Sequence, residues 1–101
     1  MVVEFAEPAR SEFDEAIAYY DNQSPGLGSE FADEVHSAIN KVVRHPEAWP
    51  VVSRRARRCR TDRFPFGIMY QVKGQTIRIV AVMHLSRDPR SWKARIPETN
   101  H

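Results

Sequence analysis

The chain has 101 residues and a formal net charge of +2, with 42% hydrophobic and 28% charged residues. This length and composition predict one globular domain over residues 1–101 and exclude a disordered or collagen-like chain. Uncharged stretches such as residues 64–72 are far shorter than the roughly 20 residues of a membrane helix. The acidic N-terminus shows no secretory signal, and a single cysteine excludes a disulfide framework. We therefore expect a cytoplasmic protein without a membrane partner.

The small net charge hides a strong asymmetry between the two halves of the chain. Residues 1–50 hold ten acidic and three basic side chains, a net charge of −7, whereas residues 51–101 hold three acidic and twelve basic ones, a net charge of +9. Such polarity predicts a basic face that meets a polyanion or an acidic partner chain. The alternative interpretation is a charge distribution that serves solubility alone.

The first half of the chain predicts one strand and two helices. Val2–Phe5 is a short apolar run, and Pro8 suits the first turn of a helix because its missing N–H has no partner there. Apolar residues at helical spacing then predict a first helix from Pro8 to Tyr20, and a second stripe predicts another helix that reaches His45. Ser24 followed by Pro25 is typical of the N-cap and first position of this second helix.

The second half predicts three strands. Residues 57–61, 66–72 and 76–84 have strand-like content, with a turn at residues 73–75. The run 77–83 is apolar on both faces apart from Arg78, which predicts the central strand of the sheet. Pro89 and Pro97 limit the rest to a short turn and a tail. The predicted order β-α-α-β-β-β is an α+β architecture, a helical hairpin packed on a small, mainly antiparallel sheet.

Arginines are concentrated at the start of the second half. Arginine binds phosphates bidentately and stacks on bases, so the cluster predicts a phosphate-binding strip or a docking site for an acidic partner protein. The alternative is a solvated loop and strand edge, because basic residues also protect sheet edges from pairing. The cluster consists of Arg54, Arg55, Arg57, Arg58, Arg60 and Arg63.

Several short fragments together resemble the RelE/ParE family of bacterial type II toxin–antitoxin toxins. Each fragment is weak, but their order and spacing over almost the whole chain are specific. The fold of this family is the one that the periodicity predicts. The fragments are Phe13 with Glu15-Ala16 and Tyr19-Tyr20, Leu27-Gly28 with Phe31, Ile39, His45-Pro46, Trp49-Pro50, Phe64-Pro65-Phe66 with Ile68, Tyr70-Gln71-Val72, and His84 followed by Arg87, Pro89, Trp92 and Arg95.

The resemblance implies a toxin that a cognate antitoxin neutralises, but it leaves two targets open. RelE-like members cleave messenger RNA in the ribosomal A site, whereas ParE-like members, of the plasmid stabilisation type, inhibit DNA gyrase. Positions that act on RNA in RelE-like enzymes match Arg58, Arg60 and Arg87. Gly67 stands where a further arginine is expected, and only Trp92 lies near the position of the expected tyrosine.

The chemistry of these positions favours binding over cleavage. Attack by a 2′-hydroxyl needs a base, an acid and cations around the phosphate. Arg58, Arg60 and Arg87 can supply the cations, but an arginine stays protonated and an indole cannot transfer a proton. His84 has a suitable side chain, although we interpret it as a structural residue at a strand end. We expect a ParE-like gyrase inhibitor; the alternatives are an mRNA endoribonuclease and a non-toxic adaptor.

We predict one extended binding surface for nucleic acid or a partner protein, and no metal or other cofactor. The histidines and Cys59 lack metal-ligand spacing, and Cys59 is expected to face the interior, away from its arginine neighbours. Trp92 can stack on Arg87 or on a base. The predicted surface consists of Arg54, Arg55, Arg57, Arg58, Arg60, Arg63, Trp92 and Arg95.

Overall fold

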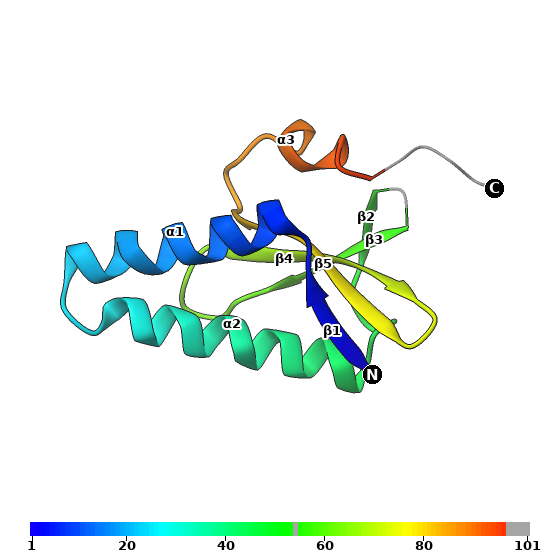
Figure 1. The fold of residues 1–101 in the computed structure, drawn as a ribbon, viewed down its shortest axis with the longest axis horizontal. Helices are drawn as coiled ribbons and strands as arrows, with labels where there is room; N and C mark the ends of the chain where they lie inside the picture. Colours follow the sequence, from blue (N-terminus) through cyan, green and yellow to red (C-terminus); the bar gives the residue numbers. More distant parts are fainter. Residues whose placement is uncertain (54, 97–101) are drawn as a thin grey trace.

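The computed structural model describes residues 1–53 and 55–96, which form a five-stranded sheet with two long helices and one short helix (Figure 1). The predicted α+β class and the helical hairpin are confirmed. Two elements were not predicted, the edge strand β2 and the helix α3. In chain order the elements are β1 (Val2–Phe5), α1 (Glu7–Gln23), α2 (Leu27–Arg44), β2 (Val51–Ser53), β3 (Ala56–Arg60), β4 (Phe66–Lys73), β5 (Thr76–His84) and α3 (Arg90–Lys93).

The strand order is β1-β5-β4-β3-β2, with β1 parallel to β5 and every other pair antiparallel. The prediction that residues 77–83 form the central strand is wrong by one position, because β4 occupies the middle. β5 nevertheless has a strand on each side, and both of its faces are apolar because the helical hairpin covers one and the segment with Trp92 covers the other. Lys73 pairs with Thr76, and Gly74 between them has a φ of 60°, as the tight hairpin turn requires.

The link between the two helices differs from its prediction. Ser24 does not cap α2; it follows the end of α1, where its N–H donates to the carbonyl of Tyr20. The N-cap of α2 is Gly26, whose φ of 89° favours glycine. The side chain of Asp21 accepts hydrogen bonds from the N–H groups of Gly26 and Gly28, at 3.0 and 3.3 Å. This carboxylate satisfies donors at the start of α2 that the serine was expected to serve.

One face of the sheet packs against α1 and α2 and holds the larger apolar core. Ala9 and Phe13 of α1 meet Phe31 and Val35 of α2 over the inward side chains of the strands. Cys59 is buried in this core, as the strand alternation predicts, and burial raises the pKa of its thiol. No helix of the described residues is long and apolar enough to cross a membrane.

The opposite face of the sheet carries a second, smaller core. Met69 and Met83 point away from the helical hairpin and pack with Trp92 of α3 and Ile96 just after it. In Figure 1, α3 lies apart from α1 and α2. This second core explains why the segment after Pro89 forms a helix, because a buried tryptophan anchors a stretch that is otherwise too short to be helical alone.

Candidate functional site

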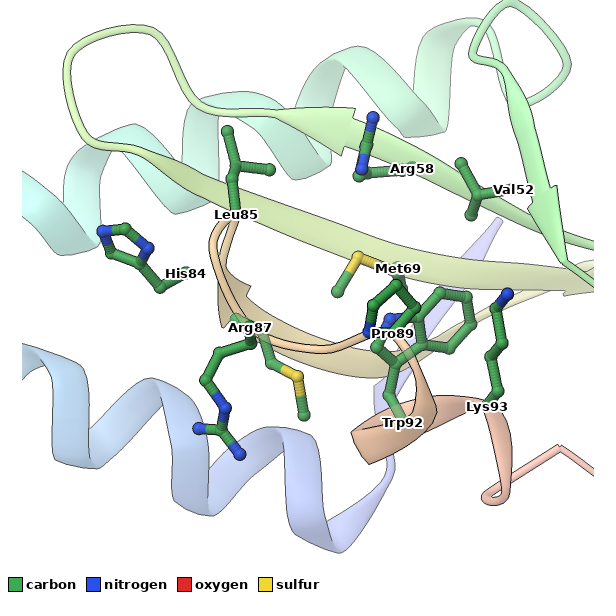
Figure 2. Close-up of a pocket in the computed structure, with 10 residues that line it drawn as sticks. Val52, Arg58, Met69, His84, Leu85, Arg87, Pro89, Trp92 and Lys93 are labelled. Atoms are coloured by element: carbon green, nitrogen blue, oxygen red, sulfur yellow. The ribbon is translucent and has the colours of Figure 1, made fainter.

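A pocket of about 260 Å³ lies between the second face of the sheet and α3 (Figure 2). Its walls come from four strands, the connection after β5, and α3 itself. Residues far apart in the sequence therefore meet at one place. The lining residues are Val52, Arg58, Met69, Met83, His84, Leu85, Arg87, Pro89, Trp92 and Lys93.

The interior of this pocket is apolar and adaptable. Met69 and Met83 project from neighbouring strands, and Trp92 covers them from α3; all three are buried. Leu85 and Pro89 extend the same apolar surface along the connection. Methionine side chains are flexible and polarizable, so such a surface can adjust to the shape of a bound apolar group.

Three cations surround the apolar interior. Arg58 comes from β3, Arg87 from the connection after β5, and Lys93 from α3, and Figure 2 shows the two arginines on opposite sides of the apolar side chains. No carboxylate of the described residues forms an ion pair with any of the three. The Nε of Arg58 is buried and has no hydrogen-bond partner within the described chain. A buried charged donor of this kind favours an incoming acceptor.

His84 supplies the one imidazole among the lining residues. Its Nδ1 accepts a hydrogen bond from the N–H of Ser86 at 3.1 Å and lies 2.7 Å from the hydroxyl oxygen of Ser86. Its ring also packs edge-on against Phe66. In Figure 2 the imidazole lies at one end of the site, away from Trp92 and Lys93. The pocket therefore combines several cations with a single imidazole and contains no carboxylate or phenol.

The glycine at position 67 has a structural explanation. It pairs with Arg60 on β3, and the stem of Arg58 lies across it. A Cβ atom at Gly67 would lie 3.0 Å from Cδ of Arg58 and 3.2 Å from Leu85. The absence of a side chain at Gly67 thus leaves room for Arg58 to pack against the sheet. An arginine at position 67 would displace the side chain of Arg58.

Charged contacts flank the helix α3, and those beyond its end hold it against the sheet. At its start, Asp88 accepts hydrogen bonds from the N–H and the guanidinium of Arg90, which lower the pKa of this carboxyl. Beyond its end, Arg95 donates to Glu12 of α1 at 2.6 Å and to the carbonyl of Val80 at 3.0 Å. These contacts fix the wall of the pocket that carries Trp92 and Lys93.

The predicted surface residues are not brought together as one strip. Arg58, Arg87 and Trp92 share the pocket, whereas Arg60 is exposed and lines a groove beside Trp49 and Lys41. Arg95 is half-buried in its ion pair with Glu12, which makes it a structural contact of α3.

The other arginines of the cluster point elsewhere. Arg57 donates to the carbonyls of Glu47 and Trp49, at 3.1 and 2.6 Å, and so holds the segment after α2. Arg63 lies 2.6 Å from Glu30 of α2, and this hydrogen bond raises the pKa of the guanidinium. Arg55 is exposed with a φ of 69° in the turn between β2 and β3. Arg54 lies outside the described residues.

Sequence reasoning missed Lys93 and the apolar interior of the pocket. Lys93 lies next to Trp92 in α3, a segment for which a turn and a tail are predicted from the sequence. The sequence places Met69 and Met83 in strands but does not predict which face of the sheet they occupy, because both faces of β4 and β5 are apolar. Among the described residues, no group of three His, Cys, Asp or Glu side chains is placed to hold a metal ion.

Known proteins share the sequence pattern and the fold of this chain. The family model of the ParE toxin of type II toxin–antitoxin systems, parDE, matches residues 3–89. A solved structure titled as a chromosomal ParDE TA system from P. aeruginosa matches with a TM-score of 0.72 and 19% sequence identity. The match covers 83% of this chain and 95% of that chain, and at this identity it shows the fold alone. The search of curated proteins found no matching sequence.

Proposed function

The chain belongs to the ParE toxin family of type II toxin–antitoxin systems, and we propose that it inhibits growth by binding DNA gyrase through the face that carries Arg58, Arg87 and α3. We further propose that a cognate antitoxin protein neutralises it, and that both interactions take place in the cytoplasm. The family match supports the class of toxin, and the chemistry of the pocket supports binding over catalysis.

The observation that supports binding over cleavage is the composition of the pocket. Cations surround an apolar interior, and the lining contains neither a carboxylate nor a phenol. Phosphodiester cleavage by a 2′-hydroxyl requires a base and an acid in addition to cations. The lining offers a single imidazole, so it holds one such group where the reaction needs two. A site of this kind is suited to holding a partner surface rather than to moving protons.

The test is DNA supercoiling by purified gyrase with the isolated chain titrated in. We expect inhibition by the wild-type chain and at least a tenfold weaker effect of Arg87→Glu, because this exposed cation belongs to the pocket. Lys73→Glu is the matched control, since it makes the same charge change at the exposed end of β4. Unimpaired supercoiling with an excess of folded wild-type chain would contradict the proposal.

An mRNA endoribonuclease is the second candidate function. One observation favours it: Arg58 and Arg87, which match RNA-contacting positions of RelE-like members, line the same pocket. This function predicts new messenger RNA ends when the chain is induced, and their loss in Arg58→Ala and Arg60→Ala. Mapping of RNA ends after induction separates the two functions, because gyrase inhibition produces no such ends.

A further inference from the structure

We propose that the pocket beneath α3 receives one large apolar side chain from an acidic segment of the antitoxin, whose flanking carboxylates pair with Arg58, Arg87 and Lys93. This inference rests on the proposed neutralisation by an antitoxin and assigns that interaction to one place on the chain. The occupant is defined by its chemistry: an apolar anchor of the size of leucine, methionine or phenylalanine with acidic neighbours.

The size and lining of the pocket support an apolar anchor. A volume of about 260 Å³ is close to the lower end of the pockets that hold small ligands. Trp92, Met69 and Met83 are buried around it, while Leu85 and Val52 are only partly buried. Anchors of this kind contribute most of the binding energy of protein interfaces when a pocket excludes water around them.

The charges around the pocket support acidic neighbours of that anchor. Arg58, Arg87 and Lys93 come from three different parts of the chain and line the same pocket, and no carboxylate is among its lining residues. The buried Nε of Arg58 lacks a partner within the described chain. A carboxylate beside the anchor can accept from this donor, and charge-assisted hydrogen bonds of that type are the stronger ones.

The other side of the molecule repels such a segment. The helices α1 and α2 contain eight acidic and three basic side chains, a net charge of −5. Glu7, Asp14, Glu15 and Asp33 among them are exposed. Electrostatic complementarity therefore directs an acidic chain away from the helical hairpin and toward α3, and it raises the association rate at low ionic strength.

The same cations could attract a nucleic acid, but the interior of the pocket favours a peptide. A phosphate gains no favourable contact from the two buried methionines. The ring of Trp92 already packs against the sheet, so it is not free to stack on a base. The apolar interior contributes favourably to binding when an apolar group enters it and removes its surface from water. Binding of single-stranded RNA or DNA at this place is an outcome that the experiment below distinguishes.

The experiment measures the dissociation constant of the antitoxin that co-purifies with the chain, after the two have been separated and refolded. Leu85→Trp fills the pocket, Val52→Trp fills it from β2 in case the first variant does not fold, and Arg87→Glu reverses one cation. We expect each folded variant to bind at least tenfold more weakly. The control Lys73→Glu is expected to stay within twofold of the wild-type chain.

Alanine replacements within the acidic segments of the same antitoxin test the anchor itself. We expect one apolar residue whose loss weakens binding to the wild-type chain tenfold or more and changes binding to Leu85→Trp by less than twofold. Non-additivity of this kind places the residue in the pocket.

The possible failures are distinguishable. Unchanged affinity in all pocket variants overturns this inference and leaves neutralisation by an antitoxin intact. Absence of any protein that binds the chain and restores growth contradicts the proposed neutralisation, and the inference with it. Tight binding of a 20-nucleotide single-stranded RNA or DNA that is lost in the pocket variants, with antitoxin affinity unaffected, assigns the site to nucleic acid and also overturns the inference.

Discussion

The two faces of the sheet are covered in different ways. Among residues 1–53 and 55–96, the face toward α1 and α2 holds a core of sixteen buried residues under helices of 17 and 18 residues. In the same described part of the chain, the core on the opposite face has seven buried residues, with the four-residue helix α3 over it. The pocket with the cations Arg58 and Arg87 opens on this second face. The difference indicates that one face supplies most of the stability, and that the other retains incompletely filled space for a partner.

The side chains on each face fit this division. On the helical face, Phe31 contacts the rings of Phe64 and Phe66 at centroid distances of 5.3 and 4.8 Å, and both contacts are edge-to-face. Rigid aromatic packing of this kind specifies one arrangement. On the α3 face, Met69 and Met83 are flexible and can repack around an incoming group.

The largest expected effect is loss of an aromatic ring from the helical face. Phe31→Ala should destabilise the chain by about 4 kcal/mol, because the residue is fully buried and loss of its ring leaves a cavity in the core. Trp92→Ala should cost less, since a pocket already lies beside the indole and the short helix α3 can detach. Urea unfolding followed by circular dichroism measures both changes. Equal costs would contradict the division of the two faces.

A smaller effect is expected at the contact that joins the two faces. Glu12 of α1 accepts hydrogen bonds from Arg95 at 2.6 Å and from the N–H of Val82 at 3.1 Å, and it is largely buried. Glu12→Ala should cost about 2 kcal/mol, because charged hydrogen bonds are lost and a backbone donor loses its partner.

The matched control for this change is Asp14→Ala on the same helix, whose ion pair with Arg10 is exposed on both sides. That pair contributes little, so the control should stay within about 0.5 kcal/mol of the wild-type chain. Urea unfolding gives both values. If Glu12→Ala behaved like the control, the contact between Glu12 and Arg95 would not help to hold α3.

The helical face was also the more predictable one from sequence. Phe13, Ala16 and Tyr20 repeat at helical spacing, and this period alone identifies a buried stripe. The strand boundaries of β5 followed equally directly from the residues that flank it. The N-cap of α2 was misplaced because Ser24 and Gly26 both suit a helix start, and the contact of Asp21 with two N–H groups is visible only in three dimensions.

The α3 face could not be predicted because its elements are short and its contacts are distant in sequence. β2 has three residues and α3 has four, too few for a period to appear. The arginine cluster predicted a basic surface, but Arg63 is engaged by an acid of α2, 33 residues away. Arg58 and Arg87, in contrast, line the same pocket because β3 and β5 flank β4. The sequence composition shows where the basic residues are concentrated. The three-dimensional structure is needed to tell which of them form structural contacts and which are available to a partner.

A further prediction concerns pH on the helical face. Tyr70 is fully buried and donates to the carbonyl of Pro46 at 2.7 Å, and burial raises the pKa of its phenol to about 12. Tyr70→Phe should cost about 1 kcal/mol near pH 7, because this carbonyl loses its donor.

The pH dependence of Tyr70 follows from its two states. The unfolded chain ionises this phenol from about pH 10, whereas the folded chain holds the proton up to about pH 12. Its contribution is therefore complete below pH 10 and is lost as the pH rises toward 12. Urea unfolding at pH 7, 10 and 11.5 should show the cost of Tyr70→Phe shrinking. A constant difference between the two proteins would contradict the role of burial.

The smallest expected effect lies on the α3 face and has the opposite pH dependence. The hydrogen bonds from Arg90 lower the pKa of Asp88, so the folded chain holds this carboxylate ionised more tightly than the unfolded chain does. Its contribution is present above about pH 4, the ordinary value for an aspartate, and is lost as the pH falls through the lowered value. Asp88→Asn keeps an oxygen that can accept from the N–H of Arg90 but removes the charge.

Because Asp88 is exposed, the change should alter the seating of α3 more than the global stability. Fluorescence of Trp92 in a Trp49→Phe background, recorded from pH 6 to pH 2.5, reports this seating directly. The aspartate protein should shift its emission to the red at a pH where the asparagine protein does not change, since other carboxylates titrate equally in both. Coincident curves would mean that Asp88 does not affect the position of α3. The wall of the pocket would then be held only beyond the C-terminal end of α3, by the contact between Arg95 and Glu12.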